Sequence, residues 1–216
     1  MNIKITKNNE EFYRLSAWVI VNQILTKPNS VIGLSTGRTT GGIHNAVAEI
    51  YKAHPFDTSK VIIFNLDEVT NVSRDYFGSC YYMILNEFIK PLNIPVENFI
   101  MPPSISDDWK TECQKFEAAI SAKGDVDLQV LGIGENGHIG FNQPGTPFSQ
   151  TTFTSFMDER LEKRIRSETD SPDSVKLGGI TYGIKNVMAS KKILLVANTY
   201  AKKDILNKAL NGPITT

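Results

Sequence analysis

Hydrophobic and polar positions follow two different periods along this chain. Short uninterrupted runs of aliphatic residues predict buried strands, whereas longer segments with apolar residues three or four positions apart predict helices. The expected strands are 31–35, 60–66, 98–101, 127–134 and 192–198. The expected helices are 9–26, 41–52, 76–90, 109–122, a segment near 180–189, and 200–211. The segment 159–166 (ERLEKRIR) has the pattern of a basic, solvated face.

The alternation of strands with helices predicts the fold class. Continuous apolar strands separated by helices indicate an α/β protein in which helices cover both faces of a mostly parallel sheet. The chain has 216 residues and no internal repeat, low-complexity tract or Pro/Gly/Ser-rich linker. We therefore expect residues 1–216 to form a single domain.

Composition and charge narrow the class of protein. The 23 basic and 23 acidic residues cancel, which disfavours a nucleic-acid binder. The apolar runs 17–21 and 193–197 are too short to cross a bilayer, and residues 1–20 are too polar for a signal peptide. Cys80 and Cys113 form no CxxC pair, which disfavours a zinc site or a disulfide scaffold. We expect a soluble, cytoplasmic protein without a membrane or nucleic-acid partner.

Three of the predicted strands end in polar loops, namely 35–40 (STGRTT), 65–68 (NLDE) and 134–138 (GENGH). Ligands of parallel α/β sheets bind beyond the carboxyl ends of the strands. The convergence of the three loops on that edge is stronger evidence for a site than any one loop.

The first loop has the residues that a phosphate site needs. Gly37 lets the backbone approach a ligand closely, the hydroxyls of Thr36 and Thr39 can donate hydrogen bonds, and Arg38 can form a charge-assisted fork. The spacing is not that of a P-loop, which disfavours a nucleoside triphosphate. A threonine N-cap beside a glycine turn would account for the same residues.

The second loop places two adjacent carboxylates, Asp67 and Glu68, directly after an apolar strand. A carboxylate at the mouth of a closed site can act as a general base. The alternative is an aspartate that caps the next turn. Metal binding is disfavoured because no histidine lies nearby at ligand spacing.

The third loop extends over 132–145 (GIGENGHIGFNQPG) and contains a GxGxxG pattern at Gly132, Gly134 and Gly137. A nicotinamide dinucleotide site would need a helix to begin at the last of these glycines, but the residues that follow include two more glycines and a proline, so we reject that interpretation. His138 is a candidate for proton transfer because imidazole titrates near neutral pH. A purely structural histidine is the alternative.

Two cationic positions remain to be explained. Arg166 lies in the basic segment, and Lys202 lies in the first turn of the last predicted helix, where the helix dipole disfavours a cation. An anionic ligand would account for both, although chance placement on the surface would account for them almost as well.

Together the three loops resemble a known family. VIGLSTGRTT (31–40), FNLDEV (64–69) and LGIGENGHIGFNQPGT (131–146) are similar to motifs of the glucosamine-6-phosphate deaminase family, which includes galactosamine-6-phosphate deaminase/isomerase and is related to 6-phosphogluconolactonase. The resemblance runs in order from about residue 30 to the end. It implies a Rossmann-like domain that converts a hexosamine 6-phosphate to a ketose 6-phosphate and ammonia, with no cofactor and no metal.

The resemblance also implies a role for each matching residue. Asp67 matches the general base that moves a proton from C2 to C1 of the sugar through an enediol-type intermediate, and His138 matches the residue that helps to open the sugar ring. The positions that match phosphate contacts are Thr36, Gly37, Arg38, Thr39, Arg166 and Lys202. Of these, Arg166 depends on an alignment with a one-residue gap.

Four departures from the family pattern change the expectation. Asn136 and Gln143 stand where the family commonly has acids, which weakens a ring-opening relay of histidine and carboxylate. His138 would then act alone or with Glu135, or the substrate would enter as the open chain. Family members that an N-acetylated sugar phosphate regulates carry a pair of basic residues in the stretch after Gln150. This chain lacks the pair, so we do not expect that allosteric regulation here. The sequence ends at GPITT, where family members usually continue into another strand and helix.

These departures leave alternatives open. The sugar could be glucosamine or galactosamine 6-phosphate. A lactonase-type hydrolase would use His138 to activate water. A sugar-phosphate sensor that has lost catalysis would retain the phosphate loop, and Gln143 favours that alternative whereas the intact Asp67 opposes it. A homo-oligomer is also compatible with the sequence.

Overall fold

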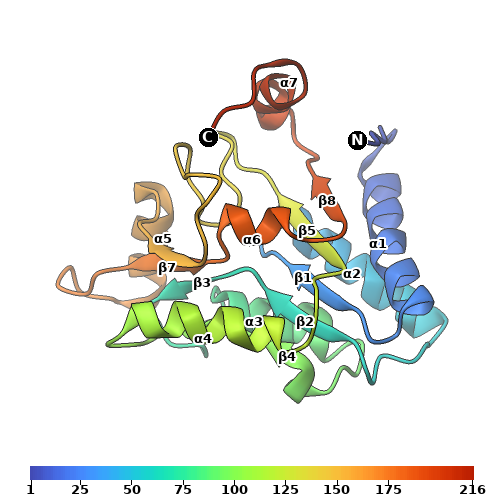
Figure 1. The fold of residues 1–216 in the computed structure, drawn as a ribbon, viewed down its shortest axis with the longest axis horizontal. Helices are drawn as coiled ribbons and strands as arrows, with labels where there is room; N and C mark the ends of the chain where they lie inside the picture. The colour runs from blue at the N-terminus through green and yellow to red at the C-terminus, as the bar shows by residue number, and fades with distance from the viewer.

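A five-stranded parallel sheet forms the centre of the computed structural model, which describes residues 1–216 (Figure 1). Its strand order is β4-β2-β1-β5-β8. The strands are β1 (Val31–Leu34), β2 (Ile62–Asn65), β4 (Phe99–Ile100), β5 (Leu128–Gly132) and β8 (Ile193–Val196). Every pair in this sheet is parallel, with Gly33 of β1 opposite Phe64 of β2 and Gln129 of β5.

Helices connect the strands. They are α1 (Asn9–Thr26), α2 (Arg38–Ala53), α3 (Cys80–Ile84), α4 (Trp109–Ser121), α5 (Glu159–Thr169), α6 (Ile184–Met188) and α7 (Lys203–Asn211). A π-helical turn (Leu85–Ile89) continues α3, and short 3-10 helices span Val96–Asn98 and Tyr200–Lys202.

Helices cover both faces of the main sheet, which confirms the predicted fold class. On one face, α1, α2 and the α3–π segment bury aliphatic side chains such as Ile24 and Ile43 against Ile32 of β1. On the other face, Phe116 of α4 and Val187 of α6 belong to a second cluster of buried side chains. Figure 1 shows α4 and α6 on the near side of the sheet. Strand side chains alternate between the two clusters because successive Cβ atoms point to opposite faces.

A second, antiparallel sheet was not predicted from the sequence. It has the order β3-β7-β6 and consists of β3 (Asp67–Thr70), β7 (Gly178–Thr181) and β6 (Phe153–Ser155). The helix predicted near 180–189 is therefore wrong over its first part, since only Ile184–Met188 is helical. The physical reason is tertiary contact. Residues 178–181 pair with β3 and β6, and Gly179 allows the Phe141 ring to pack where a Cβ would overlap it.

The remaining predicted elements are present with shifted ends. The helix predicted over 76–90 begins only at Cys80, because Ser79 caps it by accepting a hydrogen bond from the Tyr82 amide. It ends in the π-helical turn. The basic segment becomes α5, whose Ile165 is fully buried in a third apolar cluster beside the small sheet. None of the helices combines the length with the apolar character that a membrane span requires.

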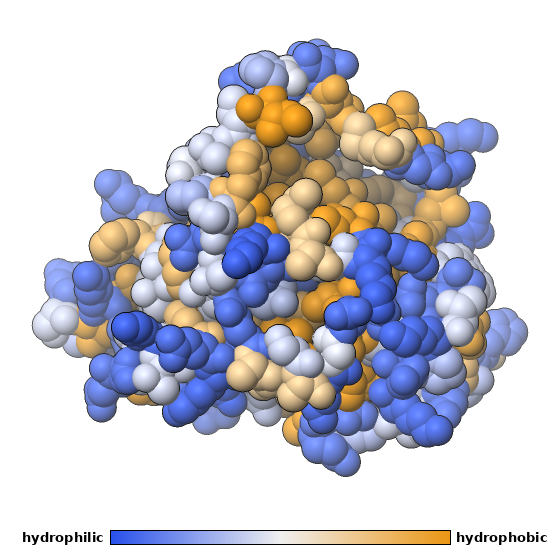
Figure 2. Space-filling view, viewed as in Figure 1, coloured by the Kyte–Doolittle hydropathy of each residue, from blue (hydrophilic) through white to orange (hydrophobic).

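Strand β8 forms one edge of the main sheet and pairs only with β5. Its side chains Ile193 and Leu195 are exposed, as are Trp18 and Val19 on α1. Figure 2 shows apolar side chains gathered in a hollow between α7 and α1. The outer edge of β8 therefore presents unpaired backbone groups beside apolar surface.

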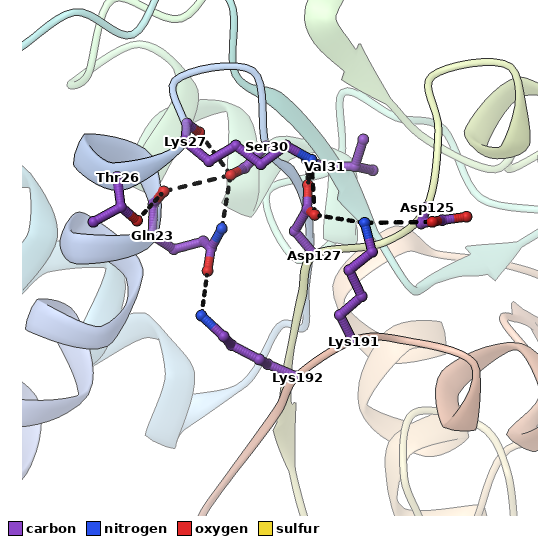
Figure 3. Close-up of polar contacts among 9 residues, drawn as sticks. All are labelled: Gln23, Thr26, Lys27, Ser30, Val31, Asp125, Asp127, Lys191 and Lys192. Carbon is purple, nitrogen blue, oxygen red and sulfur yellow. Dashed lines mark hydrogen bonds and ion pairs between the residues drawn. The ribbon is translucent and has the colours of Figure 1, made fainter.

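An ion-pair network joins the amino ends of the central strands to α1 and β8 (Figure 3). Asp127 is buried and accepts hydrogen bonds from Lys27 Nζ (2.6 and 2.8 Å), from Lys191 Nζ (3.2 Å) and from the Val31 amide (3.0 Å). Burial alone would raise the pKa of Asp127, but these donors outweigh it and hold the pKa below its usual range. The network therefore stabilises the charged carboxylate.

Replacement of Asp127 by alanine should lower the free energy of unfolding at pH 7 by about 1–3 kcal/mol, because it removes hydrogen bonds to a charged acceptor. The folded-state pKa of Asp127 lies below its unfolded value, so its contribution is present above the unfolded pKa and is lost as the pH falls through the folded one. The difference between wild type and variant should therefore shrink below about pH 4.

Urea unfolding at pH 7 and at lower pH measures both effects. The control is Asp125→Ala, which removes an exposed carboxylate that pairs with the same Lys191 at 3.3 Å. This control should change the unfolding free energy by less than about 0.5 kcal/mol. Equal losses in the two variants would contradict the importance of the buried network.

Candidate active site

The loops that follow β1, β2 and β5 meet at one edge of the main sheet. Thr36 Oγ1 lies 3.1 Å from Cys80 Sγ, and that sulfur lies 3.7 Å from Asp67 Oδ1. On its other side Asp67 faces Gly140, where an added Cβ would lie 2.9 Å from Asp67 Oδ2. Asp67 is therefore placed between the first and the third polar loop.

Helix α2 begins within the first polar loop, earlier than the sequence predicted. Its N-cap Gly37 has a φ of 143°, a conformation that favours glycine, and offers no side-chain acceptor to the first-turn amides. A helix N-terminus of this kind is suited to binding an anion. Thr39 Oγ1 donates a 2.9 Å hydrogen bond to Asn198 Oδ1, which fixes this turn to the segment that follows β8.

Two cations lie near this helix start. Arg38 is the first residue of α2, and the half-buried Lys202 immediately precedes α7. Burial lowers the pKa of Lys202, the charge of Arg38 lowers it further, and Glu135 of the third loop opposes both. The first loop, the third loop and the start of α7 therefore lie near one another, with Arg38 and Lys202 as the two cations and Glu135 as the acid among them.

Arg166, in contrast, is engaged in α5 and the loop that follows it. Its guanidinium donates to Glu162 Oε1 (2.6 and 3.0 Å), to the Pro172 carbonyl (2.8 Å) and to the Val175 carbonyl (2.9 Å). These bonds use most of its five N–H donors. The phosphate contact predicted for Arg166 stays a prediction, and the contacts that the structure gives it are with its own segment.

Asp67 is a buried carboxylate with a raised pKa. It is the first residue of β3, and its Oδ1 accepts a 3.0 Å hydrogen bond from Asn65 Nδ2. Burial raises the pKa of Asp67 to about 7, the neighbouring Glu68 adds to the effect, and hydrogen bonds from Cys80 and Asn65 oppose it. A carboxyl group that titrates near neutral pH can both accept a proton and return it.

Glu68 has different surroundings from its neighbour. Its Oε1 accepts hydrogen bonds from the Val69 and Cys80 amides, both 2.8 Å long, and its Oε2 accepts one of 2.7 Å from the Tyr81 amide. Burial raises the pKa of Glu68, and these three donors oppose that effect. Glu68 therefore caps the start of α3, whereas Asp67 faces the glycine of the third loop.

His138 is held by a chain of two amides. Its Nδ1 lies 2.7 Å from Asn136 Oδ1, and Asn136 Nδ2 donates a 3.1 Å hydrogen bond to Gln143 Oε1. An amide oxygen can only accept, so in this arrangement Nδ1 carries the hydrogen and Nε2 is free to accept one. Burial lowers the pKa of His138, the Asp158 carboxylate opposes this and Lys202 adds to it, which favours the neutral ring.

Glycine is required where the His138 ring lies. The ring occupies the space beside Gly134, and a Cβ at that position would overlap it. The middle glycine of the GxGxxG pattern, Gly134, thus leaves room for the imidazole, and no helix begins at Gly137, as the sequence predicted.

The sequence profile of one protein family, described as glucosamine-6-phosphate isomerases/6-phosphogluconolactonase, matches residues 13–215. The chain belongs to this family. A glucosamine-6-phosphate deaminase of Clostridium botulinum (strain Kyoto / Type A2) is 39% identical over 215 residues, covering 100% of this chain and 88% of that protein. Another, from Thermoanaerobacter sp. (strain X514), is 38% identical over 216 residues, covering 100% of this chain and 85% of that protein.

Solved structures of the family share the fold. A monomeric glucosamine-6-phosphate deaminase of the NagB superfamily superposes with a TM-score of 0.91 at 31% identity, covering 100% of this chain and 89% of that chain. A 6-phosphogluconolactonase from Trypanosoma cruzi superposes with a TM-score of 0.77 at 18% identity, covering 100% of this chain and 88% of that chain. At that identity the lactonase shows the fold alone.

Sequence reasoning missed three residues at the site of this chain and gave no role to a fourth. The fourth is Asn65, which ends β2 and belongs to the second polar loop. Asn198 is a polar residue shortly after β8, so the rule that found the three loops could also have found it. Cys80 and Thr181 gave no signal in the sequence, because they reach the site only through tertiary contacts. Cys80 Sγ contacts Asp67, and Thr181 Oγ1 accepts a hydrogen bond from the Phe141 amide. Thr181 lies opposite Asp67 across the pairing of β3 with β7.

Asn136→Asp should raise the pKa of His138 by roughly 1–3 pH units, because a carboxylate beside Nδ1 favours the charged ring. Titration of the ¹⁵N-labelled histidine ring by NMR measures this value and shows which nitrogen is protonated. The same exchange at Asn86, in the π-helical turn, serves as the control and should leave His138 unchanged. An unchanged His138 pKa in Asn136→Asp would contradict the amide contact.

Proposed function

We propose that this protein converts an amino-sugar 6-phosphate, with glucosamine 6-phosphate as the first choice, to a ketohexose 6-phosphate and ammonia. The observation that carries the proposal is the position of Asp67, a buried carboxyl group with a pKa of about 7. It lies between Cys80, which contacts Thr36 before the start of α2, and Gly140 of the loop that carries His138. The identity to two glucosamine-6-phosphate deaminases supports the choice of sugar.

The substrate phosphate would bind at the start of α2. Thr36, Gly37, Arg38 and Thr39 supply backbone amides, hydroxyls and a guanidinium there, and Lys202 supplies a second cation. A dianion held at this point fixes the distance from the sugar carbons to Asp67, so that one carboxylate can act by position. Arg166 is left out of this set because its donors are engaged within its own segment.

His138 would open the sugar ring. With its hydrogen on Nδ1, Nε2 can take the proton of the C1 hydroxyl and deliver it to the ring oxygen as the C1–O bond to that oxygen breaks. The amides of Asn136 and Gln143 keep the ring oriented, but they cannot take up a proton themselves. The ring-opening step then depends on the imidazole alone.

Asp67 would carry out the isomerisation. Its carboxylate takes the proton from C2 while the C1 oxygen takes a proton from the substrate ammonium, which gives an enediol-type enolamine. Return of the first proton to C1 then leaves a hydroxyl at C1 and a double bond between C2 and nitrogen. Water then replaces nitrogen at C2, and the products are a ketose and ammonia. The chemistry needs no cofactor or metal, because the carboxyl and imidazole groups supply the proton transfers.

The proposal also covers the setting of the site. The site residues come from a single chain, and the direct passage from β2 to β3 through Leu66 supports treating residues 1–216 as one domain. The related deaminase that superposes with a TM-score of 0.91 is monomeric, so we propose the single chain as the active unit. A small sugar phosphate is the expected partner, in the cytoplasm.

Asp67→Asn should lower the rate of ammonia release by about 10²–10⁴-fold, because an amide cannot act as the base. The assay is coupled ammonia release from glucosamine 6-phosphate and galactosamine 6-phosphate side by side. Asp75→Asn, which changes an exposed aspartate of the following loop, is the matched control and should retain full activity. Full turnover by Asp67→Asn would exclude Asp67 as the base.

The same assay separates the rival functions. Release from either sugar establishes a deaminase and names its substrate. If neither sugar phosphate releases ammonia while both still raise the melting temperature, the protein is better explained as a sensor or a lactonase-type hydrolase. An assay for hydrolysis of a sugar-acid lactone phosphate distinguishes these two functions.

Lys202→Met should raise KM by roughly 10- to 100-fold, because a hydrogen bond to a charged group is worth about 1.5–3 kcal/mol. The effect on kcat should be smaller, since the phosphate does not react. Steady-state kinetics and inhibition by inorganic phosphate measure the change. Lys203→Met removes the next, exposed lysine and should leave KM within about threefold of wild type. Similar losses in both variants would point to general surface charge.

A further inference from the structure

Glu68 is a fully buried carboxylate that the proposed reaction does not use. Burying an acid is unfavourable unless its oxygens accept hydrogen bonds. Its two oxygens accept three backbone N–H groups, of which the Cys80 and Tyr81 amides belong to the first turn of α3. Glu68 thereby ties the start of α3 to β3, the strand that begins with Asp67.

The residue fixed by this tie is Cys80. Its amide donates to Glu68, and its buried side chain contacts two site residues. The sulfur lies 3.1 Å from Thr36 Oγ1 and 3.7 Å from Asp67 Oδ1. A single side chain therefore contacts both the phosphate loop and the carboxylate that faces the sugar.

We propose that Glu68 and Cys80 form a positioning unit, in which Glu68 fixes the first turn of α3 and Cys80 holds Asp67 at a set separation from Thr36. The inference builds on the proposed function, because the separation matters only if phosphate binds beside Thr36 and Asp67 transfers a proton. Neither residue touches the substrate. Both act through Asp67.

The two members of the unit act on Asp67 with opposite electrostatic sign. The negative charge of Glu68, on the same strand, raises the pKa of Asp67, whereas the thiol of Cys80, from α3, lowers it by hydrogen bonding. Asn65 of β2 also donates to Asp67, and Thr181 of β7 and Gly140 of the third loop lie beside it; none of these three residues titrates. Arg74 acts on Glu68 and reaches Asp67 only through it.

The experiment measures kcat, KM and the pH profile of kcat/KM for Glu68→Gln and Cys80→Ala. Asp67 must be deprotonated to act, so the rate should fall as the pH drops through its pKa. Glu68→Gln should move this acidic limb to lower pH by roughly one pH unit, and Cys80→Ala should move it to higher pH. Both should lower kcat, by roughly tenfold, with a smaller effect on KM.

Each variant has a matched control. Cys113→Ala removes the other buried free cysteine, on α4, and should leave the limb in place. Glu117→Gln removes another carboxylate that accepts a backbone amide, that of Thr152 at 2.6 Å, and should also leave it in place. A loss of general stability alone would move the limb in no variant, so opposite movements in the two test variants support the unit.

A direct titration separates failure of this inference from failure of the proposed function. The pKa of Asp67 can be followed by ¹³C NMR of labelled aspartate without any turnover. If the wild type releases no ammonia but the two variants still shift Asp67 in opposite directions, the function is wrong and the unit stands. An unmoved Asp67 in Cys80→Ala overturns the unit, and this variant decides the matter if Glu68→Gln does not fold.

Discussion

The structure depends on one junction in the main chain, at Leu66, where the polypeptide leaves the parallel sheet and enters the antiparallel one. The Leu66 amide donates to the Leu34 carbonyl of β1, and its own carbonyl accepts from the Tyr182 amide after β7. Buried backbone groups must be paired, so this residue cannot move without breaking pairing in both sheets. Asp67 follows directly, and the position of the candidate base is therefore set by backbone hydrogen bonds on either side of it.

Two buried aspartates at opposite ends of the sheet show how partners decide the state of a carboxyl group. Asp127, at the amino ends of the strands, meets two lysines and an amide, and its pKa is lowered. Asp67, at the carboxyl ends, meets Glu68 and weak donors, and its pKa is raised. Burial raises the pKa of both carboxyl groups. At Asp67 this effect prevails and Glu68 adds to it, whereas at Asp127 the surrounding donors and cations reverse it. The first arrangement favours stability and the second favours proton transfer.

The amides at Asn136 and Gln143 change the character of the histidine beside them. A carboxylate next to His138 would stabilise the charged imidazolium, whereas an amide orients the ring and leaves it neutral. With amides in place of the carboxylates, His138 is a neutral hydrogen-bond acceptor at Nε2, with its hydrogen on Nδ1. The positive charge of Lys202 favours the same state, since it lowers the pKa of His138.

The sequence by itself determined the parallel sheet, most of the helices and the three polar loops, because burial on one or two faces leaves a period that can be read along the chain. It also singled out Asp67, His138 and residues 36–39 as candidate site residues. It did not determine the small antiparallel sheet, since β6 and β7 are short and β7 begins with two glycines. Strand β7 forms only by pairing with β3 on one side and β6 on the other. Nor could it place Cys80 between Thr36 and Asp67 or engage Arg166 within its own segment. Those contacts join residues from separate elements, and only the tertiary structure decides which side chains of a buried face meet.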